Sequence, residues 1–164
     1  MYSNPIGREP PVAGRRETSE TDVFFLAVVQ FGHMQDSIFT QIIRGEVPCH
    51  KIYEDDKTIA FMPLHPIALG HVLVVPKVQV GDFYDLPSDD AHALMDTVQK
   101  VGKHMKNILQ TKKIGIKVVG LDVEHVHFHL VAFDTLAQYN QKEDMSAQPD
   151  HPALAQMAQK LSML

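Results

Sequence analysis

The chain has 164 residues, 45% of them hydrophobic and 21% charged, and this balance is typical of one compact domain with its own hydrophobic core. The formal net charge of −5 argues against a strongly basic surface, so we expect no nucleic-acid partner. The single cysteine, Cys49, excludes a disulfide within the chain and agrees with a reducing, cytoplasmic compartment.

The N-terminal 33 residues are rich in Pro, Gly, Arg and Glu, and they predict a poorly ordered tail before a domain over residues 34–164. The apolar run over residues 23–31 has the length of a signal-peptide core. However, acidic residues are mixed with the arginines before it, and no small-residue cleavage site follows. The run is also too short to span a membrane, so we favour a tail and expect no membrane partner.

Three segments have the periodicity of helices. A short helix is expected over residues 38–43, after the cap-like pair Asp36 and Ser37. The longest helix is expected over residues 88–110, with Ser88 as its cap, because apolar residues recur there at intervals of three and four. A third helix is expected from His151 toward the C-terminus.

Five segments have the apolar character of strands and are bounded by turn residues or proline. They cover residues 51–54, 58–62, 71–76 and 114–119, and the last lies within 121–133. Combined with the helices, this order predicts an α+β fold with an antiparallel sheet of about five strands, one long helix, and short N- and C-terminal helices.

Three histidines stand at alternate positions in the last predicted strand. Successive side chains of a strand point to opposite faces, so His125, His127 and His129 are expected to form one row, with nearest neighbours about 7 Å apart. Val126 and Phe128 are expected to point the other way, into the core.

The residues alone leave three interpretations of this row open. It could be the solvated face of a half-exposed strand. It could bind a metal, because two histidines on one face of a strand are a good zinc half-site. It could also catalyse attack at phosphorus, with one neutral imidazole as the nucleophile and its neighbours donating protons to the phosphate oxygens and the leaving group.

Three motifs, in order over about residues 36–134, resemble the histidine-triad (HIT) family. Residues 125–131 resemble the His-φ-His-φ-His-φ-φ signature, in which φ is an apolar residue. Residues 70–77 resemble the family's Gly-His-x-Leu-Val-Ile-Pro-Lys strand, and residues 37–48 resemble its opening helix. Residues 120–125 are similar to a sub-branch that reads Gly-Leu-Asp/Glu-Val-x-His.

The resemblance implies a HIT-like fold and a nucleotide phosphohydrolase or nucleotidyl transferase. Its substrates would be nucleoside phosphoramidates or dinucleoside polyphosphates, attacked at the α-phosphate. His127 would be the nucleophile that forms a nucleotidyl-histidine, with its other nitrogen bonded to a backbone carbonyl. His129 and His71 would contact the phosphate oxygens, and His125 would support the row.

The resemblance also implies an apolar pocket for the base and a homodimer. Phe39, Ile42 and Leu64 match the family's pocket residues. The helix over residues 88–110 would form the contact between subunits. Pro63 stands where the family usually has an aspartate that binds ribose.

Many family members bind a structural zinc at four positions that here hold Ser37, Thr40, Gln79 and His125. Three of the four ligands are missing, and hydroxyl groups are poor ligands for zinc. We therefore predict no structural zinc and no required cofactor.

Asp122 stands near the position of a serine with which the family binds phosphate, in a loop that is shortened here. A carboxylate there would repel phosphate unless it is protonated, turned away or bridged by a divalent cation. Alternatively, Asp122 is a turn residue that closes a hairpin. The shortened loop keeps two further functions open, a nucleotide-binding protein with little turnover and a metalloenzyme that uses the triad.

Overall fold

The structure is a computed structural model that describes residues 35–164. The predicted tail and the apolar run over residues 23–31 lie outside the described residues. None of the helices in the described part combines the length and the apolar character that crossing a membrane requires.

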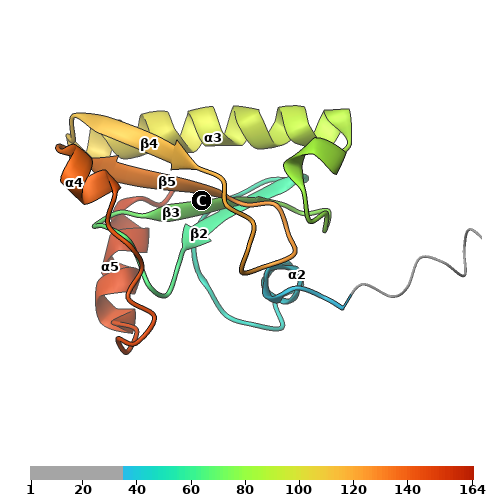
Figure 1. The fold of residues 1–164 in the computed structure, drawn as a ribbon, viewed down its shortest axis with the longest axis horizontal. Helices are drawn as coiled ribbons and strands as arrows, with labels where there is room; N and C mark the ends of the chain where they lie inside the picture. The colour runs from blue at the N-terminus through green and yellow to red at the C-terminus, as the bar shows by residue number, and fades with distance from the viewer. Residues whose placement is uncertain (1–34) are drawn as a thin grey trace, which may run out of the picture. The chain divides into compact units, whose positions relative to one another are not determined.

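In the described part of the chain, five strands form one antiparallel sheet in the order β1-β2-β3-β5-β4 (Figure 1). They are β1 (His50–Glu54), β2 (Thr58–Met62), β3 (Val72–Pro76), β4 (Lys113–Lys117) and β5 (Phe128–Phe133). The predicted α+β class is confirmed. The strand expected over residues 114–119 begins one residue earlier and ends at Lys117.

The three predicted helices are α2 (Ile38–Ile43), α3 (Ser88–Leu109) and α5 (His151–Lys160). The structure adds a 3-10 turn, η1 (Phe83–Asp85), and a single helical turn, α4 (Leu136–Tyr139), neither of which was predicted from the sequence.

The prediction that Ser88 caps the long helix is wrong. Ser88 is the first residue of α3, and Pro87 occupies the cap position. The carbonyl oxygen of Pro87 accepts from the backbone N–H groups of Asp90 and Ala91, both at 2.9 Å, so the helical hydrogen bonds already begin at the proline. Proline suits this place because it has no N–H that would be left without a partner.

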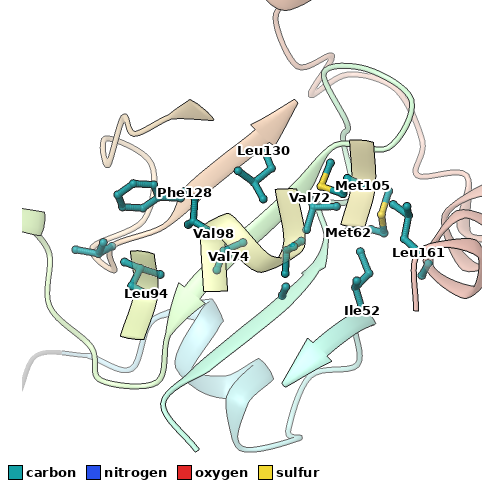
Figure 2. Close-up of a cluster of buried hydrophobic side chains, with 14 of the residues drawn as sticks. Ile52, Met62, Val72, Val74, Leu94, Val98, Met105, Phe128, Leu130 and Leu161 are labelled. Atoms are coloured by element: carbon teal, nitrogen blue, oxygen red, sulfur yellow. The ribbon is translucent and has the colours of Figure 1, made fainter. Parts of the chain in front are cut away.

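The main hydrophobic core lies between the sheet, α3 and α5, and Figure 2 shows part of it. Alternate residues of the central strands β2 and β3 supply its sheet side, among them Met62, Val72 and Val74. Val126 and Phe128 also belong to this cluster, as expected. Burial on both faces explains why β2 and β3 are continuous apolar runs rather than alternating ones.

The opposite face of the sheet packs against α2. A second cluster there joins Phe39 of α2 to residues of the same two strands, namely Ile59, Phe61, Leu73 and Val75. His129 pairs directly with Leu73 across β3 and β5, and paired residues share a face of the sheet. His129 therefore projects on the face that carries α2, away from α3.

Candidate active site

The histidine triad lies where the chain enters β5, and only its third member belongs to the strand. β5 begins at Phe128, so the prediction that one strand holds all three histidines is wrong. The backbone N–H of Val126 donates to the carbonyl oxygen of Val80 at 2.7 Å, which takes this stretch out of the sheet ladder. As a result, the His125 carbonyl is free to bond a side chain.

That carbonyl binds the ring of His127. Nδ1 of His127 lies 2.7 Å from the carbonyl oxygen of His125. A carbonyl can only accept, so Nδ1 carries the proton and the neutral ring keeps its lone pair on Nε2. Burial lowers the pKa of His127 below its usual value, which favours the neutral ring at pH 7. His127 therefore offers the unprotonated nitrogen that a nucleophile needs.

His71 and His129 form a hydrogen-bonded pair beside His127. The backbone N–H of Ile67 donates to Nδ1 of His71 at 3.0 Å, so Nε2 of His71 carries the proton. That Nε2 lies 3.0 Å from Nδ1 of His129 and donates to it. The neutral His129 ring is left with its own proton on Nε2.

The two rings of this pair are uncharged at neutral pH. Burial, reinforced by neighbouring positive groups, lowers the pKa of His71 to about 3 and that of His129 to about 4. The His129 ring lies 5.0 Å from that of His127, centroid to centroid, closer than the spacing expected along a strand. The site thus combines one lone pair with one adjacent N–H donor.

His71, His129 and Glu143 form a cluster that could hold a metal ion, because one potential ligand atom from each lies within 4.8 Å of the others. The hydrogen bonds argue against this use. A metal ligand needs a lone pair, and both nitrogens of His71 are engaged, one accepting from Ile67 and one donating to His129. A metal would have to break that arrangement.

The four positions of the family's structural zinc do lie together. Oγ of Ser37 is 2.8 Å from Nδ1 of His125, and Nε2 of His125 is 2.8 Å from the carbonyl oxygen of Pro76. Oγ1 of Thr40 and the backbone N–H of Ser37 both donate to Oε1 of Gln79. These two hydroxyls, one amide and one imidazole do not fit zinc, which prefers thiolate and imidazole ligands.

The three residues predicted to form a base pocket line one cavity of about 230 Å³. Phe39 and Ile42 come from α2, and Leu64 follows β2. The Phe39 ring lies 5.0 Å from the His127 ring, so the cavity adjoins the triad. Glu143 and Met145 also line it, and neither was predicted from the sequence.

Asp122 lies exposed in the loop between β4 and β5. Its charge raises the pKa of His127, of His129 and of Glu143. In the two histidines burial has the larger effect, so their pKa values remain below the usual value. The carboxylate therefore acts on the triad electrostatically. Its possible role as a turn residue does not exclude this effect.

We expect the purified protein to contain less than about one zinc per two chains, because only His125 of the four positions is a good ligand. Elemental analysis after dialysis measures this. A variant with Ser37→Cys, Thr40→Cys and Gln79→His is the positive control and should gain zinc. Stoichiometric zinc in the wild type that survives dialysis against a weak chelator would contradict the prediction.

Comparison with known proteins agrees with the geometry. The HIT domain family model matches residues 44–136. An uncharacterized HIT-like protein of Methanocaldococcus jannaschii is 35% identical over 101 residues, covering 57% of this chain and 76% of that protein. Adenosine 5′-monophosphoramidase HNT1 of Candida albicans is 34% identical over 106 residues, covering 57% of this chain and 68% of that protein.

A solved structure shares the fold over most of its length. It is a HIT-like protein of Bartonella henselae, with a TM-score of 0.69 and 28% identity, covering 79% of this chain and 96% of that one. The triad, the strand that ends at Pro76 and this shared architecture lead to one conclusion. The chain belongs to the HIT family.

Proposed function

We propose that this protein is a nucleotide phosphohydrolase or nucleotidyl transferase that works through a nucleotidyl-histidine on His127. The observation that carries the proposal is the hydrogen bond from Nδ1 of His127 to the carbonyl of His125, which leaves Nε2 unprotonated. Relatives named adenosine 5′-monophosphoramidase favour nucleoside phosphoramidates over dinucleoside polyphosphates as the substrate class.

The first step joins His127 to phosphorus. With the base in the cavity beside Phe39, Nε2 of His127 attacks the α-phosphorus, and the bond from phosphorus to the leaving amine breaks. The amine takes up a proton from solvent. Nε2–H of His129 donates to a phosphate oxygen, where negative charge builds up in the transition state.

In the second step, water attacks the phosphorus and the bond to Nε2 of His127 breaks. The water's proton passes to solvent, and the neutral imidazole is restored. The net reaction consumes one water and yields a nucleoside monophosphate and an amine. The expectation that His71 also contacts a phosphate oxygen does not fit its hydrogen bonds, because both of its ring nitrogens are already engaged. His71 would instead act by holding His129 in one tautomer.

Lys117 supplies positive charge beside these neutral rings. It pairs with His129 across β4 and β5, and its charge lowers the pKa of both His71 and His129. Its ammonium lies 4.5 Å from the centre of the Tyr139 ring and donates to the Tyr139 carbonyl. Lys117 would attract phosphate and offset the repulsion by Asp122.

We also propose a cytoplasmic homodimer. β4 is an edge strand of the described sheet, and Ile116, Val118 and Val119 in or just after it are about half exposed. Met95 and Ile108 of α3 are also partly exposed, so a partner that covers both elements would bury apolar surface. A monomer by light scattering at micromolar concentration would contradict the dimer.

His127→Ala should reduce turnover of a nucleoside phosphoramidate by several orders of magnitude, with little change in the affinity for nucleoside monophosphate. The nucleophile acts mainly in the transition state, so kcat falls without a matching rise in KM. His92→Ala, at an exposed position on α3, is the matched control and should keep full activity.

Rapid quenching followed by mass spectrometry should detect a nucleotidyl adduct in the wild type and none in His127→Ala. If the wild type binds nucleotide without turnover or adduct, the protein is the nucleotide-binding alternative. Equal losses in both variants would contradict the role of His127.

A further inference from the structure

The cavity beside the triad is lined by one acidic residue that was not predicted from the sequence, Glu143. Most residues that line it are apolar, with Phe39, Ile42 and Leu64 among them, but Glu143 lines it as well. Pro63 lines the same cavity and offers no polar side-chain atom. Glu143 is the only acidic side chain of the described residues that lines this cavity.

The fold holds Glu143 in this place from both sides. Glu143 lies between α4 and α5. The hydroxyl of Tyr139, the last residue of α4, donates to the carbonyl oxygen of Ile116 at 2.6 Å. On the other side, Asp150 caps α5, whose residue Leu154 is buried in the main core. The segment is therefore anchored at each end and brings one carboxylate back to the site.

The Glu143 carboxylate is partly buried beside a histidine ring that does not donate to it. Its Oε1 lies 3.7 Å from Nδ1 of His129, but that nitrogen already accepts from His71 and the His129 ring is neutral at pH 7. Among residues 35–164, no hydrogen bond to this carboxylate is formed. Burial raises the pKa of Glu143 and Asp122 adds to the effect, and together they outweigh the lowering by nearby positive groups. The side chain is still 29% exposed, so it keeps part of its water and a ligand can reach it.

We propose that Glu143 binds the 2′- and 3′-hydroxyl groups of the ribose and makes the site selective for ribonucleotides. The inference rests on the proposed function, which puts the base in the cavity and the α-phosphate at His127. The Phe39 and His127 rings pack edge to face with their centres 5.0 Å apart, so the cavity that Phe39 lines opens directly beside His127. The sugar joins the base to the α-phosphate, and it would therefore lie where the cavity meets the triad, next to His129 and Glu143.

The chemistry of the ligand supports this assignment. Two carboxylate oxygens can accept from two neighbouring hydroxyl groups, as acidic residues do with ribose in dinucleotide sites. Phosphate cannot be the partner, because two anions repel. The exocyclic amino group of the base is the other donor in such a ligand, and the experiment separates it from the sugar.

The test compares binding of AMP and 2′,3′-dideoxyadenosine monophosphate by titration calorimetry. We expect the wild type to bind AMP at least about 10-fold more tightly, because hydrogen bonds to a charged group are among the stronger ones. In Glu143→Ala the two affinities should agree within about 2-fold. Glu143→Gln keeps one accepting oxygen and should retain part of the preference.

The ratio of affinities isolates the hydroxyl groups. Removing the Glu143 charge changes the binding of both monophosphates equally, so that effect cancels. Glu46→Ala, an exposed acidic position after α2, is the control and should keep the wild-type ratio. Purine riboside monophosphate lacks the amino group of adenine. Its affinity should fall in Glu143→Ala by the same factor as that of AMP.

Three results would overturn the inference. The first is a wild type that does not prefer AMP, and the second is a Glu143→Ala variant that keeps the preference. The third is a Glu143 effect that disappears with purine riboside monophosphate, since the base would then be the partner. If AMP itself does not bind to the wild type, the proposed nucleotide site fails too. Normal AMP binding with an unchanged ratio overturns only the role of Glu143.

Discussion

The hydrogen bond from Nδ1 of His127 to the carbonyl of His125 determines what the site can do. It depends on His125 lying before the start of β5, outside the sheet. In the sheet, the His125 carbonyl would accept from a neighbouring strand instead of from the His127 ring. Val126 keeps the chain there through its bond to Val80. The loop before α3, which holds Val80, thereby helps to position the His127 ring.

A chain of polar contacts continues outward from this bond. The His125 ring is fixed between Ser37 at the start of α2 and the carbonyl of Pro76 at the end of β3. The carbonyl that orients His127 is thus tied to the helix that also supplies Phe39. The cavity side of α2 and the His127 ring are therefore connected through hydrogen bonds between neutral groups.

The site works with neutral rings surrounded by a few charges. Burial keeps His71 and His129 uncharged at pH 7, so each has a definite donor and acceptor. Lys117 provides positive charge from the neighbouring strand β4. Negative charge comes from Asp122 in the loop before β5 and from Glu143 in the cavity. Under the proposed function, phosphate would be held by the directed N–H donor of His129 and by Lys117 rather than by a strongly positive field.

The sequence predicted those helices and strands whose residues follow a regular apolar pattern along the chain. Periodicity predicted α3, and apolar runs predicted β2 and β3, because both faces of these strands are buried. The alternation of three histidines predicted their grouping, but not the point where β5 begins, which the distant residue Val80 decides. Glu143 gave no signal at all, because it lies outside a regular element and outside the HIT match, and only the return of the chain from α4 brings it to the cavity.

The most direct test is the tautomer of His127, measured by nitrogen-15 NMR of the histidine rings at pH 7, with His127→Ala used to assign its signals. The account predicts a neutral ring with the proton on Nδ1, and neutral His71 and His129 rings with protons on Nε2. A His127 ring that carries its proton on Nε2, or on both nitrogens, would contradict it, because no lone pair would then face the phosphorus.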